Sequence, residues 1–369
     1  LLKERAETGR IYIMNLDHCN THSSFKDKVY MSNLCQEITL PTTPVQHIDD
    51  KEGEIALCIL SAINLGLLTD MNELEELCDL SVRALDEIID YQEYPVEAAK
   101  ISTQARRSLG IGYIGLAHYL AKNQVGYEDK KALKIVDKIT EAFQFYLLKA
   151  SNNLAKEKTR CLWFEKTKYS DGILPIDTYK KELDDIVSRD YTYDWEWLRK
   201  EIKEHGLRHS TLSAQMPSES SSVVSNATNG VEPPRDYLSV KKSKKGPLKQ
   251  IVPDYNRLKN YYTLLWDMKG NEGYINIIAV MQKYFDQAIS GNWSYNPENY
   301  KDGEVPLSVM AQDLLTTYKL GWKTAYYQNT YDAKSDIDEP VHPVGWHDGV
   351  EEAPKETKED EEDCEACTI

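Results

Sequence analysis

The chain has 369 residues, of which 41% are apolar and 28% are charged, and its formal net charge is −16. This composition is typical of a soluble globular protein with one large or two ordinary domains. The excess of acidic residues argues against nucleic-acid binding, which needs clustered Lys and Arg, and no apolar run is long enough to cross a membrane.

The cysteines are scattered and odd in number, and we expect no secretory leader. A disulfide scaffold needs paired cysteines in an oxidising compartment, so this pattern favours a reducing one. We therefore expect a cytoplasmic location, in the host cytoplasm if the protein is viral.

Near the N-terminus, residues 10–16 combine apolar and β-favouring side chains, which predicts a strand. The polar loop at 18–24 holds His18, Cys19 and His22, which are possible metal ligands. No second group of ligands accompanies them, so we expect no metal site.

Residues 32–38, Ser-Asn-Leu-Cys-Gln-Glu-Ile, carry an amide, a thiol and a carboxylate at alternate positions. In an extended segment residues two apart project to the same side, which predicts that Asn33, Cys35 and Glu37 share one face. An amide, a sulfur and a proton acceptor side by side form a candidate catalytic group. The alternative is a strand end with a buried cysteine, since a free Cys commonly packs as a small apolar side chain.

A short apolar run at 53–62 contains Cys58 and has the length of a buried strand. From Asn72 onward leucines recur at helical spacing, and Pro95 marks the start of a further helix. These patterns predict that strands and helices follow one another along this part of the chain.

Residues 110–115 match the dinucleotide-binding pattern G-x-G-x-x-G. That site requires a strand before the glycines and a helix that begins at them, whereas residues 98–109 have a helical pattern. We therefore interpret the glycines as a close-packed junction between helices.

The rest of the chain contains several predicted helices. Apolar periodicity places them at 132–156, 191–205, 255–266, 273–289 and 306–320. The lysines around Gly246 indicate a solvated hairpin tip and not a nucleic-acid site.

A strand predicted at 207–214 leads into Met-Pro-Ser-Glu-Ser-Ser-Ser at 216–222. A strand followed by Pro, hydroxyl residues and a helix favours an anion site, because exposed backbone N–H groups and the positive end of the helix dipole attract phosphate. Several hydroxyls add hydrogen-bond donors. An ordinary serine N-cap is the alternative.

Two adjacent tyrosines, Tyr326 and Tyr327, follow the helix predicted at 306–320. In a strand their rings would point to opposite faces, which favours one core aromatic and one rim aromatic. The alternative is a redox pair, since a phenol can lose a proton and an electron together.

From residue 332 onward acidic residues dominate, which predicts a flexible tail because such a composition cannot bury a core. The tail ends in Cys364 and Cys367, whose C-x-x-C spacing suits half of a zinc site or a redox dithiol. No second Cys or His pair lies nearby, so we favour a mobile dithiol.

Together these motifs point to a family. The chain resembles the C-terminal part of the large, catalytic subunit of class Ia ribonucleoside-diphosphate reductases over nearly its whole length. The resemblance implies an α/β fold, in which residues 1–331 form the C-terminal portion of a ten-stranded α/β barrel with surrounding helices and residues 332–369 form the flexible tail. The matching segments are 33–37, 53–58, 216–221, 226–230, 325–329 and the terminal C-x-x-C.

The resemblance implies roles in the reduction of ribonucleoside diphosphates to deoxyribonucleoside diphosphates. Cys35, at the tip of a loop inside the barrel, would be the thiyl radical that abstracts the ribose 3′-hydrogen. Glu37 would take the 3′-hydroxyl proton, and Asn33 would orient the sugar hydroxyls. Cys58 would be one of two thiols that reduce the 2′ position as water leaves.

The resemblance also implies partners. Tyr326 and Tyr327 would carry the radical to Cys35 from a small subunit that holds a diiron-tyrosyl site, so this chain would bind no cofactor directly. The terminal cysteine pair would re-reduce the active-site disulfide and be recharged by thioredoxin or glutaredoxin. The diphosphate of the substrate would be bound by Ser218, Glu219, Ser220 and Ser221.

In the family, an N-terminal regulatory region and the first half of the barrel precede the part that matches, and that half supplies the thiol partner of Cys58. Cys19, Cys78 and Cys161 lie in other contexts and none fits this role. We therefore expect one half of a split large subunit, which assembles with a separate N-terminal chain.

Two other functions remain open. The chain could be a non-catalytic assembly module that binds the small subunit through the helix predicted at 306–320, although the intact set of catalytic residues argues against this. It could also be a glycyl-radical or cobalamin-dependent relative that shares the barrel. The tyrosine pair, and the lack of a C-terminal glycyl-radical loop, argue against that relative.

Overall fold

The computed structural model describes residues 1–332 except 10, 189, 244 and 245. The predicted acidic tail from residue 333, with Cys364 and Cys367, lies outside the described residues. In the described part, no helix is both long enough and apolar enough to cross a membrane.

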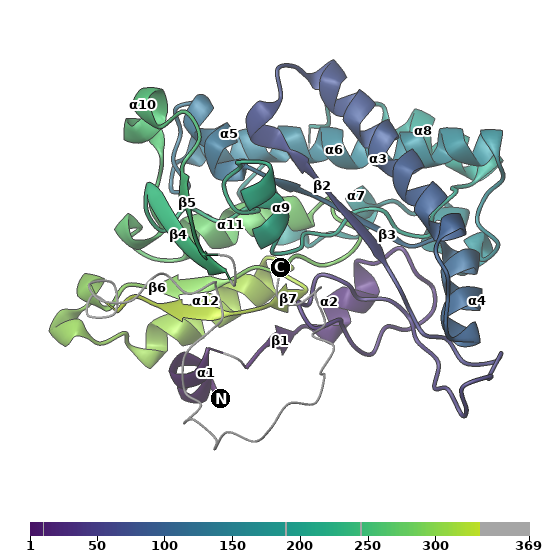
Figure 1. Ribbon diagram of the computed structural model, residues 1–369, viewed down its shortest axis with the longest axis horizontal. Coiled ribbons are helices and arrows are strands. Elements are labelled where there is room, and N and C mark those ends of the chain that lie inside the picture. The colour runs from purple at the N-terminus through teal and green to yellow at the C-terminus, as the bar shows by residue number, and fades with distance from the viewer. Residues whose placement is uncertain (10, 189, 244–245, 333–369) are drawn as a thin grey trace.

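Helices and strands are interspersed along the chain, with the longest run of helices, α5 to α9, between β3 and β4 (Figure 1). The α-helices are α1 (Leu2–Thr8), α2 (Leu16–Thr21), α3 (Met71–Tyr91), α4 (Glu97–Arg106), α5 (Leu116–Lys122), α6 (Lys130–Glu157), α7 (Pro175–Thr178), α8 (Trp195–His205), α9 (Glu219–Val224), α10 (Tyr255–Leu258), α11 (Glu272–Gln282) and α12 (Leu307–Lys319). The strands are β1 (Ile13–Met14), β2 (Ile59–Asn64), β3 (Leu109–Ile114), β4 (Leu238–Ser243), β5 (Gly246–Ile251), β6 (Trp293–Tyr295), β7 (Thr324–Ala325) and β8 (Gln328–Thr330).

A row of parallel extended segments forms the frame of the molecule. β2 and β3 pair in parallel along their whole lengths. Ser213 forms a parallel bridge with Ile111 of β3, and Gln215 forms one with Ile289, so the row continues through two further segments. The second of these runs into β6, which pairs in parallel with β8. The arrangement is α/β, as predicted, and this row does not close into a barrel within the described residues.

Two antiparallel pairs complete the strands. β1 pairs with β7, with Ile13 opposite Ala325, which confirms a strand in the predicted 10–16 region and brings it beside the tyrosine pair. β4 and β5 form the hairpin predicted around Gly246.

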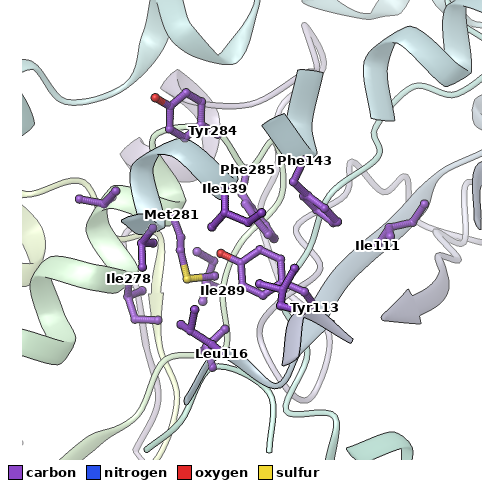
Figure 2. Packing of buried hydrophobic residues seen from close by; sticks show 14 of the residues in the cluster. Ile111, Tyr113, Leu116, Ile139, Phe143, Ile278, Met281, Tyr284, Phe285 and Ile289 are labelled. Atoms are coloured by element: carbon purple, nitrogen blue, oxygen red, sulfur yellow. The ribbon is translucent and has the colours of Figure 1, made fainter. Parts of the chain in front are cut away.

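The main core lies between β3, α6 and α11. Figure 2 shows Ile139 and Phe143 of α6 and Met281 of α11 gathered around Tyr113 of β3. The Tyr113 ring meets Phe143 edge-on at 5.3 Å and Phe285 at 5.8 Å between centroids. Because burial of each large apolar side chain contributes about 1.5–3 kcal/mol, this cluster holds the parallel row against its helices.

The glycine-rich stretch at 110–115 is a strand, so the helix junction that we predicted is wrong. Gly110 and Gly112 lie inside β3, and Gly115 follows it in the left-handed region with φ 77°. An added Cβ at Gly112 would lie 2.5 Å from the Ala214 carbonyl oxygen. The helical pattern before the glycines is confirmed as α4, which ends at Arg106, and the glycines permit close approach of the neighbouring backbone within the strand that follows.

Two helix predictions are wrong in extent. In the 255–266 segment α10 is only 4 residues long, and further along the backbone bonds to another loop, as Leu265 N–H does to Pro234 C=O. The helix predicted at 273–289 ends at Gln282, because the residues beyond it pair with the 213–215 segment. The helices predicted at 132–156, 191–205 and 306–320 are confirmed as α6, α8 and α12, although α8 begins only at Trp195.

A buried carboxylate joins α3 to the segments beneath it. Asp86 is fully buried and accepts hydrogen bonds from Arg107 at 2.6 Å, Lys158 at 3.0 Å and Arg208 at 3.0 Å. Burial by itself would raise the pKa of Asp86, but the hydrogen bonds from His209 and Lys158 and the charge of Arg107 hold that pKa well below its ordinary value. The cluster therefore fixes α3 to the start of β3 by charge.

Replacement of Asp86 with Ala leaves several cationic groups without their buried counter-charge. Removal of one partner from such a cluster costs about 3–5 kcal/mol, so we expect the free energy of unfolding, measured by urea titration of the chain, to fall by that amount. Asp90→Ala is the matched control, because Asp90 also bonds Arg107 but its side chain is 48% exposed. Its loss should cost at most about 1 kcal/mol, and equal losses in the two variants would contradict the prediction.

A side chain at Gly112 has no room without a backbone shift, because the nearest atom to its Cβ is a carbonyl oxygen. We expect Gly112→Ala to lower the free energy of unfolding by about 1–3 kcal/mol. Gly270→Ala is the control, since nothing lies within 4 Å of a Cβ added there. If Gly112→Ala and Gly270→Ala both melted at the wild-type temperature, the backbone at Ala214 would have room to move away from β3, and the prediction would be contradicted.

Candidate active site

Residues 33–38 form a tight turn, so the prediction of an extended segment with one shared face is wrong. Asn33 N–H donates to Ile38 C=O at 3.0 Å, and Asn33 Oδ1 accepts from Ile38 N–H at 3.1 Å. Gln36 takes the left-handed conformation with φ 65°. The segment forms a turn and not a strand because the Asn33 side chain hydrogen-bonds to the nearby backbone, as Asn commonly does in turns. Cys35 consequently lies at the tip of a loop.

The Cys35 thiol contacts a phenol that lies 291 residues further along the chain. The Tyr326 hydroxyl donates to Cys35 Sγ, with 3.5 Å between the oxygen and the sulfur. Burial, and hydrogen bonds with Cys35 and Tyr327, raise the pKa of Tyr326 well above its ordinary value. The phenol therefore keeps its proton at neutral pH.

Three tyrosine rings gather beside this contact. The Tyr326 and Tyr327 centroids lie 4.1 Å apart with an interplanar angle of 55°, so the prediction that they face opposite sides is wrong. Strand pairing is interrupted at these residues, because β7 ends at Ala325 and β8 begins at Gln328. The third ring belongs to Tyr12, whose centroid is 4.7 Å from that of Tyr326 and 5.3 Å from that of Tyr327.

Tyr12 belongs to none of the sequence motifs that predict site residues. Tyr12 lies immediately before β1, and the antiparallel pairing of β1 with β7 brings it to the pair. The available signal was its place in the predicted 10–16 strand. That signal says nothing about the partner strand, which lies more than three hundred residues away.

Glu37 is buried, with 2% of its surface exposed, and a serine hydroxyl lies close to its carboxylate. Ser290 Oγ is 3.3 Å from Glu37 Oε2 and also donates to the Cys35 carbonyl oxygen. Burial raises the pKa of Glu37, and hydrogen bonds from Asn33 and Ser290 offset part of that rise. A carboxylate whose pKa is raised toward neutrality suits a general base.

Cys58 lies one residue before β2 and packs against a small apolar cluster. The cluster contains Ile38, the residue that follows Glu37, and therefore joins Cys58 to the Cys35 turn. Burial raises the pKa of the Cys58 thiol well above its ordinary value, and the carboxylates of Glu37 and Asp286 add to the rise. Cys58 is consequently a protonated thiol at neutral pH.

The serine-rich stretch forms a short helix whose hydroxyls bond mainly to their own turn. Ser218 has φ 59° and its side chain makes no cap hydrogen bond, so the ordinary serine N-cap is not formed. Ser221 and Ser222 donate to the Ser218 carbonyl oxygen at 3.2 Å and 2.7 Å. Glu219 and Ser220 are partly exposed in the first turn.

One backbone segment, residues 288–290, connects this stretch with the Cys35 turn. Gln215 N–H donates to Ala288 C=O at 3.1 Å, and Ser290 N–H donates back to Gln215 C=O at 2.9 Å. Ala288 N–H donates to Glu37 C=O at 2.9 Å. No strand forms at 207–214 as predicted, because this segment makes only isolated bridges at Ser213 and Gln215. The predicted catalytic turn and the extended segment that leads into the predicted phosphate site nevertheless bond to the same short stretch of backbone.

The possible metal ligands at 18–22 bond to protein groups. His18 Nδ1 lies 2.8 Å from the Trp322 carbonyl oxygen, and His22 bonds Thr178 Oγ1 and the Gln282 carbonyl oxygen. Among the described residues, no three His, Cys, Asp or Glu side chains gather in a group that could hold a metal ion.

Comparisons with known proteins identify the family of this chain. The family model described as "Ribonucleotide reductase, barrel domain" matches residues 1–328. The chain is 59% identical over 344 residues to the ribonucleoside-diphosphate reductase subunit alpha of Haemophilus influenzae, covering 92% of this chain and 46% of the relative. It is 56% identical to ribonucleoside-diphosphate reductase 1 subunit alpha of Escherichia coli (95% and 46% covered) and 41% identical to subunit alpha of phage T4 (100% and 47% covered).

The chain spans about half the length of these curated relatives. The family match covers nearly all of the residues that the structure describes, including the turn, Cys58 and the tyrosine pair. The chain belongs to the ribonucleotide reductase family, as part of its barrel domain.

Proposed function

We propose that this chain carries the reactive thiol and the radical path for the reduction of ribonucleoside diphosphates, as part of a reductase alpha subunit. The observation that carries the proposal is the 3.5 Å contact between the Tyr326 hydroxyl and Cys35 Sγ, with the Tyr327 ring packed behind it. A chain of phenols that ends at a thiol suits the stepwise transfer of a hydrogen atom.

The radical would enter from a small subunit at Tyr327 and move inward. Each step transfers one electron and one proton, so that a tyrosyl radical at Tyr326 takes the hydrogen atom of the Cys35 thiol and leaves a phenol and a thiyl radical. Because burial and hydrogen bonding raise the pKa of Tyr326, loss of the proton alone is disfavoured. This favours loss of the proton together with the electron.

At the substrate, the Cys35 thiyl radical would remove the ribose 3′-hydrogen while Glu37 accepts the 3′-hydroxyl proton and Asn33 orients the sugar. Cys58 would supply reducing equivalents to the 2′ carbon as water leaves, together with a second thiol from the part of the subunit that this chain does not span. The high pKa of Cys58 keeps its hydrogen available for this step.

The serine-rich stretch would bind the diphosphate of the substrate. The partly exposed first turn, with Glu219 and Ser220, would face the phosphates, while the Ser221 hydroxyl donates within its own turn. The proposal is supported by the segment 288–290, whose backbone bonds both Gln215, shortly before this stretch, and Glu37 of the Cys35 turn.

Exposed apolar side chains indicate where partners would bind. Leu34 is 64% exposed and Leu60 41%, and β2 pairs only with β3 in the described part of the chain. We propose that this side meets the other half of the barrel, whether as a separate chain or not. On α12, Leu315 is 63% exposed and Tyr318 is 44% exposed, which makes this helix the proposed small-subunit contact.

Cys364 and Cys367 would re-reduce the Cys58 disulfide, with thioredoxin or glutaredoxin as the external reductant. A tethered dithiol acts at a high effective concentration, which suits this role. A cytoplasmic location follows from the same requirement for a reducing environment.

The test is nucleotide reduction by the complete complex, with the other half of the alpha subunit and the small subunit present. Cys35→Ser and Tyr326→Phe should each lower the rate of CDP reduction to background, because each removes a transferable hydrogen from the path. Cys161→Ser is the control, since Cys161 is buried in the main core. Activity that survives in Cys35→Ser would refute the proposal. A wild-type complex that binds the small subunit without reducing CDP would favour the assembly-module alternative.

Tyr12→Phe should reduce the rate without abolishing it. The Tyr12 hydroxyl bonds the tyrosine pair, and a hydrogen bond of this kind contributes about 0.5–1.5 kcal/mol. We therefore expect CDP reduction to slow by about two- to tenfold. Tyr119→Phe, on α5, is the control, and a rate that matches it would show that Tyr12 only fills space.

A further inference from the structure

One hydroxyl lies between the two groups that would act on the substrate. Ser290 is buried, with 4% of its surface exposed, and stands on the segment that bonds Glu37 and Gln215. Its Oγ has two acceptors within reach, the Cys35 carbonyl oxygen and Glu37 Oε2. The contact with Cys35 is the shorter of the two, and the distance to Glu37 is 3.3 Å.

A serine hydroxyl has one hydrogen and can fully satisfy only one of these acceptors at a time. When Glu37 is ionised, its carboxylate and the Cys35 carbonyl oxygen compete for that hydrogen. When Glu37 is protonated, its own O–H can donate to Ser290 Oγ while Ser290 donates to Cys35. The hydrogen-bond pattern at the Cys35 backbone therefore depends on the proton at Glu37.

Two side chains donate to Glu37, Asn33 and Ser290, and of the two it is Ser290 whose hydroxyl also bonds the Cys35 carbonyl oxygen. Cys58, from the segment before β2, is a titratable group that interacts with Glu37. The Cys35 thiol belongs to the same turn as Glu37 and bonds the Tyr326 hydroxyl. Asp286 lies at the start of the same extended segment, and Lys323 of the 322–323 stretch donates to the Asp286 carbonyl oxygen. Neither cationic nor acidic side chains bond the Glu37 carboxylate among the described hydrogen bonds, which come from Asn33 and Ser290.

We infer that Ser290 is a positioning residue that couples the protonation of Glu37 to the backbone position of Cys35. The inference rests on the proposed function, in which Glu37 gains the 3′-hydroxyl proton while Cys35 holds the radical. Transfer of the substrate proton to Glu37 would then reinforce the Ser290–Cys35 bond. This would hold the Cys35 loop still during the step in which Sγ must stay near the substrate and Tyr326.

The experiment measures the protonation of Glu37 directly. The carboxyl C=O band of Glu37 is followed by infrared titration of the chain, with Glu37→Gln used to assign the band. Ser290→Ala removes a hydrogen bond to the ionised form, so the midpoint should move to higher pH by about one unit. In the complete complex, the acid limb of the pH profile of CDP reduction should move in the same direction, with KM changed less than kcat.

Ser290→Thr keeps the hydroxyl and should restore the wild-type midpoint. Ser294→Ala, four residues further along in β6, removes a hydroxyl that accepts a bond from Asn329 and should change neither the midpoint nor the profile. A Ser290→Ala midpoint equal to that of wild type would overturn the inference. A wild-type complex without CDP reduction would instead contradict the proposed function, whereas the infrared midpoint needs no turnover and would still report the Ser290–Glu37 bond on which the inference rests.

Discussion

The structure depends on one buried backbone segment, residues 287–291. Its N–H and C=O groups bond the Cys35 turn at Glu37, the strand segment at Gln215 and, through the Gly291 carbonyl oxygen, the backbone of Tyr326. A buried backbone that leaves α11 after Gln282 must find partners for its polar groups, and these three neighbours supply them. The Cys35 thiol, the Glu37 carboxylate and the Tyr326 phenol are therefore held by the same backbone segment, although they lie far apart in the sequence.

Buried charges keep that support in place. Lys323 is fully buried, and its Nζ donates to the Asp286 and Gln287 carbonyl oxygens at 2.8 Å and 2.9 Å. Burial lowers the pKa of Lys323 to about 7. The Asp286 carboxylate in turn accepts from the backbone N–H groups of Leu212 and Ser213. Because an unpaired buried charge is costly, any shift of the segment would break several of these bonds together.

The sequence could predict the long helices, but not how distant segments of the chain meet. The apolar periodicity of α6 and α12 is sufficient to predict both helices, because apolar residues at helical spacing over many residues indicate an amphipathic helix. The Cys35 turn was missed because the Asn33 side chain bonds locally to the backbone, which alternation of residue types does not reveal. The sequence did not predict β3, because its glycines are needed for the close approach of the neighbouring backbone, which local strand propensity does not reveal. Tyr12 could not be placed, since its partners are set by a strand pairing at very long range.

The same burial that holds the site together also fits its groups to hydrogen-atom chemistry. Ionic catalysis needs thiolates and phenolates, which are stabilised by exposure or by nearby cations. Here burial raises the pKa values of Cys58 and Tyr326 well above their ordinary values, so sulfur and oxygen keep their hydrogens. Glu37 is raised as well, but Asn33 and Ser290 donate to its ionised form and limit the rise. Burial therefore keeps Cys58 and Tyr326 protonated, so that each could donate a hydrogen atom. The hydrogen bonds from Asn33 and Ser290 stabilise the ionised form of Glu37, so that its carboxylate could accept a proton.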